Sequence, residues 1–303
     1  MPTTSVRDLV VHGDDLVAAT YGRAFWILDD LTPLRQIDDK IYSAKTLLYR
    51  PEKALRVRRD LNGDTPIPPE LPAGTNPPDG ALIDYYLKTP ATSDVKLEIY
   101  DSAGKLVREL SSKPELPSNE PPPNVPEYWL AHPEPLSTHA GMNRIVWDLH
   151  YASPPVVRHE LPMSALYEAT PSEPEGALAL PGKYEVRLTA NGQTLKQTLE
   201  VSMDPRVDVT PDQLQHEFSL EQGVIQLVTD SFGGYHQALL MHEAIAADEA
   251  KPEAVPILDA LKDLDKKVSE LQGSQSGGPQ QAGGGNRDGV EGRPETGEGG
   301  HRG

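Results

Sequence analysis

The stretch from Val6 to Leu31 reads VRDLVVHGDDLVAATYGRAFWILDDL and contains three short apolar runs separated by two turn sequences. The runs cover residues 6–11, 16–21 and 24–28, and each has the length and the Val, Leu and aromatic content of a β-strand. Gly13 and Gly22 lie in the turns, where a hairpin requires a positive φ. The stretch therefore predicts a three-stranded antiparallel meander. Residues 34–37, after Pro33, could add a fourth, outer strand.

The apolar runs of this meander are nearly continuous rather than alternating, which predicts that both faces of the sheet are covered. A four-stranded sheet covered on both faces is the unit of a β-propeller. One such sheet alone does not bury enough surface to be stable. We therefore expect cover for a group of its large side chains: Val10, Leu16, Phe25, Trp26 and Ile27.

The segment LVAATYGRAFWILDDLTPLRQ, residues 16–36, resembles the closing blade of bacterial β-propeller proteins with neuraminidase (Asp-box) repeats or sortilin-type propellers. In that family the final blade leads into a β-sandwich and then into helices. The later segments DGALIDYYLK, VKLEIYDSAGKLVREL, GMNRIVWDLHY and PGKYEVRLTANGQTLKQTLEVSMDPR follow the same order, so the resemblance covers roughly residues 3–250. It implies a glycosyl-hydrolase-like or sortilin-like protein without assigning a chemistry.

Earlier blades with the Asp-box pattern S-x-D-x-G-x-x-W are absent from this sequence. The resemblance therefore implies the C-terminal region of a longer parent, a fragment or a partner subunit, whose missing blades belong to another polypeptide. On this basis we expect a propeller-bearing polypeptide, rather than the rest of this chain, to cover the meander.

The composition excludes several classes of function. A formal net charge of −18 over 303 residues disfavours nucleic acid and anionic membranes as partners. With no cysteine, the chain has no disulfide, thiolate nucleophile or zinc–thiolate site. The N-terminus lacks the pattern of a signal peptide, and no apolar run approaches membrane-spanning length. By resemblance, the parent family is extracellular or periplasmic.

The chain divides into five predicted regions. Residues 1–40 form the blade remnant, and residues 41–80 a connector with bridging strands at 44–49 and 54–57 and a Pro- and Gly-rich part at 60–79. Residues 81–206 contain about seven short strands, which is typical of an immunoglobulin- or fibronectin-like β-sandwich. In it, Val95, Leu97 and Ile99 share one face of a strand, Ile145, Trp147 and Leu149 share another over 144–151, and Asn191-Gly192 forms a hairpin turn. The proline-rich segments 114–135 and 152–180 are predicted loops.

Residues 210–272 predict a helical hairpin. Thr210 is a helix cap, followed by Pro211 and by Gln213 three residues after the cap. Gly233-Gly234 would kink or end this helix before 235–247, and apolar spacing over 257–271 predicts another helix. Residues 273–303 have no apolar cluster and predict a disordered tail.

The sequence contains no complete catalytic or cofactor-binding motif. His216-Glu217 and His242-Glu243 each begin like the zinc motif H-E-x-x-H, but neither has the second histidine, so solvated helix faces are the favoured interpretation. No metal, cofactor or catalytic residue is therefore assigned.

The most distinctive polar pair is Asp29-Asp30, beside Arg23 and Trp26. We favour a structural interpretation, in which the aspartates cap the strand end and pair with Arg23 or Arg35 while Trp26 fills a core between blades. The alternative is a weak sugar or peptide subsite with the tryptophan as platform. Trp129, in a proline-rich loop, could be a second exposed platform.

Two functional classes remain open. The first is a non-catalytic C-terminal module that supports a propeller and binds protein or glycan. The second is the accessory end of a glycoside-hydrolase-like or sialidase-like enzyme whose catalytic residues lie on the absent blades. We favour the module, because no group of residues here carries a reaction by itself.

Overall fold

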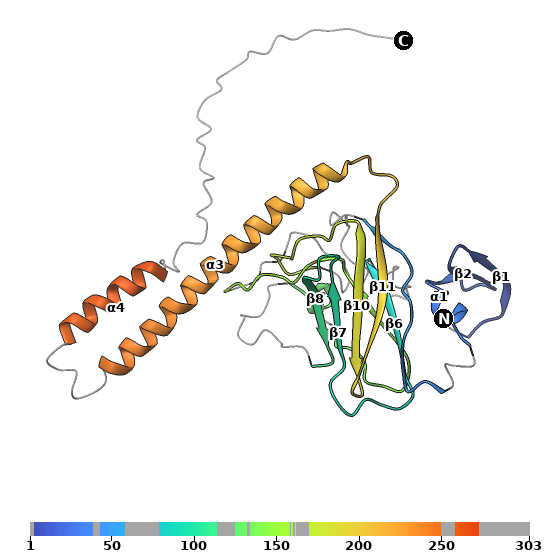
Figure 1. Ribbon diagram of the computed structural model, residues 1–303, viewed down its shortest axis with the longest axis horizontal. Coiled ribbons are helices and arrows are strands. Elements are labelled where there is room, and N and C mark those ends of the chain that lie inside the picture. The colour runs from blue at the N-terminus through green and yellow to red at the C-terminus, as the bar shows by residue number, and fades with distance from the viewer. Residues whose placement is uncertain are drawn as a thin grey trace, which may run out of the picture. The chain divides into compact units, whose positions relative to one another are not determined.

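The computed structural model describes residues 3–38, 43–57, 79–113, 125–131, 134–157, 159, 161, 170–249 and 258–272 (Figure 1). The protein is mainly β. It divides into two compact units, Met1–Gly233 and Gly234–Gly303. The described strands belong to the first unit. Most of the predicted Pro- and Gly-rich connector and the predicted tail lie outside the described residues.

The N-terminal meander forms as a separate sheet of strands β1 (Val6–His12), β2 (Asp15–Thr20) and β3 (Phe25–Leu28). Its order is β1-β2-β3, and both pairings are antiparallel. Gly13 and Gly22 have φ values of 63° and 72°, which lets them close the two turns. The predicted three strands are confirmed.

The predicted fourth strand at 34–37 is wrong. Residues Thr32–Arg35 instead form the short helix α1, with Pro33 in its first turn, where a missing backbone N–H costs nothing. The backbone N–H of Arg35 donates to the carbonyl of Leu31 over 3.1 Å. The side chain of Arg35 also donates to the carbonyl of Gly13 over 2.9 Å and forms an ion pair with Asp14. These contacts hold the segment back against the β1–β2 turn.

Eight further strands form two sheets. The five-stranded sheet has the order β5-β11-β10-β7-β8 and the three-stranded sheet the order β4-β6-β9. All pairings are antiparallel except that of β5 with β11. The strands are β4 (Thr46–Leu48), β5 (Ala54–Arg56), β6 (Ala81–Leu87), β7 (Lys96–Tyr100), β8 (Leu106–Ser111), β9 (Gly141–Trp147), β10 (Gly182–Ala190) and β11 (Gln193–Met203).

The segment 41–80, expected to be a connector, contributes β4 and β5 to these two sheets. Leu48 and Ala54 from these strands are 2% and 5% exposed and belong to the same core as the later strands. The predicted strands at 44–49 and 54–57 are therefore confirmed as β4 and β5. They do not bridge two regions but form part of the core sheets. The physical reason is that their apolar residues complete the inner faces of both sheets.

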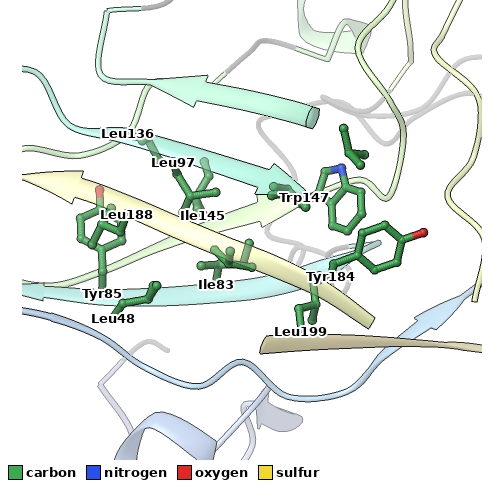
Figure 2. Close-up of a cluster of buried hydrophobic side chains, with 14 of the residues drawn as sticks. Leu48, Ile83, Tyr85, Leu97, Leu136, Ile145, Trp147, Tyr184, Leu188 and Leu199 are labelled. Carbon is green, nitrogen blue, oxygen red and sulfur yellow. The ribbon is translucent and has the colours of Figure 1, made fainter. Parts of the chain in front are cut away.

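One hydrophobic core joins the five-stranded and three-stranded sheets. Val95, Leu97 and Ile99 have no exposed surface, as their alternation predicts. Figure 2 shows side chains of both sheets meeting in this core, with Trp147 beside Tyr184, whose ring centroids are 5.4 Å apart. Strand β9 ends at Trp147, earlier than predicted, because Leu149 has a φ of 61°, although its side chain is still buried.

Two long helices follow the strands. Helix α3 (Pro211–Glu249) begins with the predicted cap, since the N–H of Gln213 donates to Thr210 Oγ1 and the N–H of Thr210 donates to Gln213 Oε1. It continues through Gly233-Gly234, so the helix bears the propensity cost of two glycines, about 1 kcal/mol each. Helix α4 (Leu258–Gln272) confirms the last predicted helix. No described helix is both long and apolar enough to cross a lipid bilayer.

Candidate functional site

The β1–β3 sheet presents apolar side chains on both of its faces. The registers Val10↔Val17↔Ile27 and Val11↔Leu16↔Leu28 assign neighbouring residues to opposite faces. One face carries Val10, Val17, Ala19, Phe25 and Ile27, and the other carries Leu9, Val11, Leu16, Ala18, Trp26 and Leu28.

These faces are not covered by the described part of the chain. Phe25 is 75% exposed, Leu9 57%, Ile27 55% and Val10 52%. Leu16 and Trp26 are half-buried, and no residue of the three strands is fully buried. Contiguous apolar surfaces are uncommon on monomeric soluble proteins and are typical of interaction sites. The cover that the sequence demanded is therefore absent from the described residues.

Arg144 on β9 fastens the end of this sheet to the core sheets. Its Nε and Nη2 donate to Asp84 Oδ1 and Oδ2, each over 3.0 Å, in a bidentate pair across the β6–β9 register. Its Nη1 also donates to the carbonyl of Asp29 over 2.9 Å, and Nη2 donates to the carbonyl of Asp30 over 3.3 Å. We call these four residues the Arg144 clamp.

Asp30 is the buried corner of the clamp. It is 3% exposed and has a φ of 58°, a conformation that aspartate adopts more readily than most residues. Its backbone N–H donates to Asp15 Oδ1 over 3.1 Å, and its Oδ1 accepts from the N–H of Thr32 over 2.8 Å, which anchors the start of α1. Its Oδ2 has no hydrogen-bond partner within the described residues.

Carboxylates dominate the electrostatics around the clamp. Burial raises the pKa of Asp84, and the hydrogen bonds from Arg144 offset this only in part. Burial, together with the negative charges of Asp30, Asp14 and Asp15, raises the pKa of Glu52. The region where the β1–β3 sheet meets the core sheets is thus acidic, and the guanidinium groups of Arg144 and Arg35 supply the positive charges that pair with its carboxylates.

The residues predicted as a site around Asp29-Asp30 are only partly brought together. Trp26 Nε1 donates to the carbonyl of Arg23 over 2.8 Å, so these two lie together in the β2–β3 turn region. Arg35 does not make the expected pair with Asp29 or Asp30 but forms an ion pair with Asp14. Arg144 instead donates to the backbone carbonyls of Asp29 and Asp30.

Trp129 lies elsewhere, in the 3₁₀ turn η1 (Glu127–Trp129). Its carbonyl accepts from the N–H of Thr170 over 2.9 Å, and its ring meets Tyr128 edge-on, with centroids 6.3 Å apart. The side chain is half-buried, and its indole nitrogen is buried without a hydrogen-bond partner in the described part of the chain. No contact of the described residues joins it to Arg23, Trp26, Asp29 or Asp30, so the platforms do not form one site.

Sequence reasoning missed the two residues at the centre of the clamp. Asp84 interrupts the apolar strand sequence ALIDYYL, and Arg144 interrupts MNRIVW. A charged residue inside a strand that is otherwise buried is a signal for a paired charge. The partner could not be assigned, because the two residues are 60 positions apart.

The histidine half-motifs lie on α3. His216 is exposed, and His242 Nδ1 lies 2.5 Å from Asp265 Oδ1 on α4. Across the described ranges, no group of three His, Cys, Asp or Glu side chains is placed to hold a metal ion. Comparison of the chain with protein-family models, with curated proteins and with solved structures finds no match.

Proposed function

We propose that the protein is a non-catalytic interaction module of a β-propeller protein. In this proposal the β1–β3 sheet is a blade-type sheet that packs between two other β-sheets of the propeller. The strands β4–β11 form an immunoglobulin-like β-sandwich that carries this sheet. The observation that carries the proposal is the exposure of large apolar side chains on both faces of one sheet.

Two-sided exposure favours a stacked arrangement over a simple dimer. A second copy docked by two-fold symmetry buries the same patch on both copies, and hence one face of each sheet. Stacked sheets instead cover both faces, as in a propeller. Each Val, Leu, Ile or Phe side chain that becomes fully buried contributes roughly 1.5–3 kcal/mol. Several such residues lie on each face, so cover on both sides is strongly favourable.

The attachment of the sheet supports the same proposal. The Arg144 clamp and helix α1 hold the end of β3 at a fixed place on the core sheets. A sheet mounted in this way can meet its neighbours without first being ordered, which lowers the entropic cost of docking. The clamp is therefore proposed to position the sheet and not to perform chemistry.

The first test is hydrogen exchange on the purified chain, together with its size in solution. Amides of β1–β3 should exchange much faster than those of the β10–β11 hairpin, or the chain should self-associate through the sheet. Equal protection of both regions in a monomer would contradict the proposal.

The second test uses a recombinant polypeptide of Asp-box blades that lacks its final blade. Binding should protect β1–β3 from exchange, and Phe25→Asp on one face and Leu9→Asp on the other should each weaken it. Binding that responds to only one of the two substitutions would show a one-sided contact and would overturn the blade assignment. The control is Leu106→Asp, because Leu106 is exposed on β8, away from the sheet.

A further inference from the structure

Helix α3 carries a second exposed apolar surface, distinct from the β1–β3 sheet. Leu220, Val224 and Leu227 are 59%, 60% and 67% exposed. Their spacing of four and then three residues places them along one side of the helix. We call these three residues the α3 seam.

The seam is not the side of α3 that packs on the core. Leu214 is 6% exposed, and the ring of Phe218 packs at a tilt against that of Tyr151, with centroids 5.2 Å apart. With about 100° of rotation per residue, Phe218 points well away from Leu220 and Val224. The core therefore holds one side of the helix and leaves the seam free.

The same heptad register continues along α3 into the second unit. Steps of four and three residues from Leu227 reach Ala238 and Ile245, each 7% exposed. In the second unit, α4 lies along this part of α3 (Figure 1), and His242 pairs there with Asp265 of α4. Ala238 and Ile245 share the heptad position of Val224, whereas Met241, at the position of Leu220 and Leu227, is 50% exposed. Helix packing in the second unit thus buries the position that Val224 occupies in the seam.

The charge of α3 indicates what kind of helix fits the seam. The 39 residues of α3 contain no Lys or Arg. Glu221 and Asp230 occupy the e and g positions beside the seam, where coiled-coil partners place opposite charges. A second copy of α3 would bring acidic residues against acidic residues.

From this continuity and charge pattern, we propose that the α3 seam binds a basic amphipathic helix of a partner protein. The partner's apolar stripe packs on Leu220, Val224 and Leu227, and its Lys or Arg side chains pair with Glu221 and Asp230. The interface extends to a partner the packing that α3 already uses within its own hairpin.

The test is fluorescence anisotropy of the full chain with a designed three-heptad peptide that has Leu at a and d and Lys at e and g. A peptide with Glu at e and g, and a scrambled Lys peptide of equal composition, serve as ligand controls. The double substitution Leu220→Gln/Leu227→Gln should weaken binding of the Lys peptide about tenfold or more. The matched control is Leu240→Gln, because Leu240 is 51% exposed on the same helix but lies off the heptad seam, and it should leave affinity unchanged.

A charge test completes the design. Glu221→Gln/Asp230→Asn should weaken binding of the Lys peptide several-fold and reduce its dependence on salt. The proposal is overturned if the scrambled peptide or the Glu peptide binds as tightly as the Lys peptide, or if the seam substitutions have no effect. It is also overturned if sedimentation shows a dimer that these substitutions dissociate, since a second copy would then be the occupant.

Discussion

Replacing Arg144 with methionine should lower the free energy of unfolding of the first unit by about 3 kcal/mol. Methionine keeps the unbranched apolar stem but removes every bond of the clamp. The carboxylate of Asp84, whose side chain is 5% exposed, then loses its cation. The carbonyls of Asp29 and Asp30 lose their donor as well.

The magnitude follows from the exposure of the two partners. Removing one member of a fully buried pair costs about 3–5 kcal/mol, because the other charge is left in a poorly solvated place. The side chain of Arg144 is 32% exposed, so in the variant water can reach the space beside Asp84. We therefore expect a cost at the lower end of this range, about 3 kcal/mol. The two carbonyl bonds add about 1 kcal/mol each to the anchoring of the β1–β3 sheet, which is a local contribution.

The assay is urea unfolding of the full chain, paired with hydrogen exchange of β1–β3 and of β10–β11. The Arg144→Met variant should shift the urea midpoint and speed exchange around Asp29 and Asp30 more than in the hairpin. Arg108→Met is the control, because the side chain of Arg108 is similarly exposed but makes weaker contacts. Its Nη2 lies 3.7 Å from Asp148 Oδ2, and its Nη1 donates to the carbonyl of Tyr151 over 3.3 Å. This substitution should cost less than about 1 kcal/mol.

A double variant separates the buried charge from simple loss of packing. Asp84→Asn combined with Arg144→Met should be about 1–2 kcal/mol more stable than the sum of the two single effects, because the uncompensated charge is gone. Two outcomes would refute the reasoning: a cost for Arg144→Met no larger than that for Arg108→Met, or strict additivity in the double variant.

Three further changes test other parts of the fold. Arg206 lowers the pKa of Asp204 to about 2 from its ordinary value of 3.8, so this stabilisation is present above about pH 5 and is lost as the pH falls towards 2. Asp204→Asn should therefore be less stable than the wild type in urea at about pH 6, with the difference shrinking at about pH 2.5. Thr210→Ala should cost about 1 kcal/mol in urea unfolding, because the N–H of Gln213 loses its acceptor, Thr210 Oγ1. Gly80→Ala should cost about 2 kcal/mol or more, lowering the Tm, since φ is 131° and the new Cβ would lie 2.1 Å from a carbonyl oxygen of β9.

Each of these changes has its own control. A stability gap for Asp204→Asn that stays constant with pH would exclude the ion pair as its cause. Thr210→Ser keeps the capping oxygen and should restore most of the loss, so an equal loss would show that the cap is unimportant. Gly104→Ala has open space around its Cβ and should cost less than Gly80→Ala, and the reverse order would contradict the steric argument.

Local sequence patterns predicted most of the secondary structure. The glycine turns and apolar runs of 6–31 predicted β1, β2 and β3, and the Asn191-Gly192 turn predicted the β10–β11 hairpin. The capping residues Thr210 and Gln213 predicted the start of α3. These features succeed because turns, caps and side-chain alternation depend on residues a few positions apart.

The candidate site was predicted less well. Asp29 and Asp30 were singled out by sequence, yet their partner Arg144 was missed, because that contact spans 115 and 114 positions. The apolar runs at 44–49 and 54–57 predict strands and match β4 and β5, but the sequence does not show that these strands belong to the two core sheets, because their partners are distant in the chain. The apolar pattern of residues 34–37 predicts a strand, but contacts of Arg35 with the β1–β2 turn and the helical bonds of Thr32–Arg35 hold this part of the chain against β1 and β2 as helix α1.

The sequence by itself therefore determined that β1–β3 is a sheet that needs cover on both faces. Consecutive apolar residues in a strand point to opposite faces, so both faces of this sheet are apolar. Only the tertiary structure decided that this cover is missing from the described chain and that Arg144 anchors the sheet. The physical reason is that burial and ion pairing depend on which distant segments the folded sheets bring into contact, and no local pattern specifies that choice.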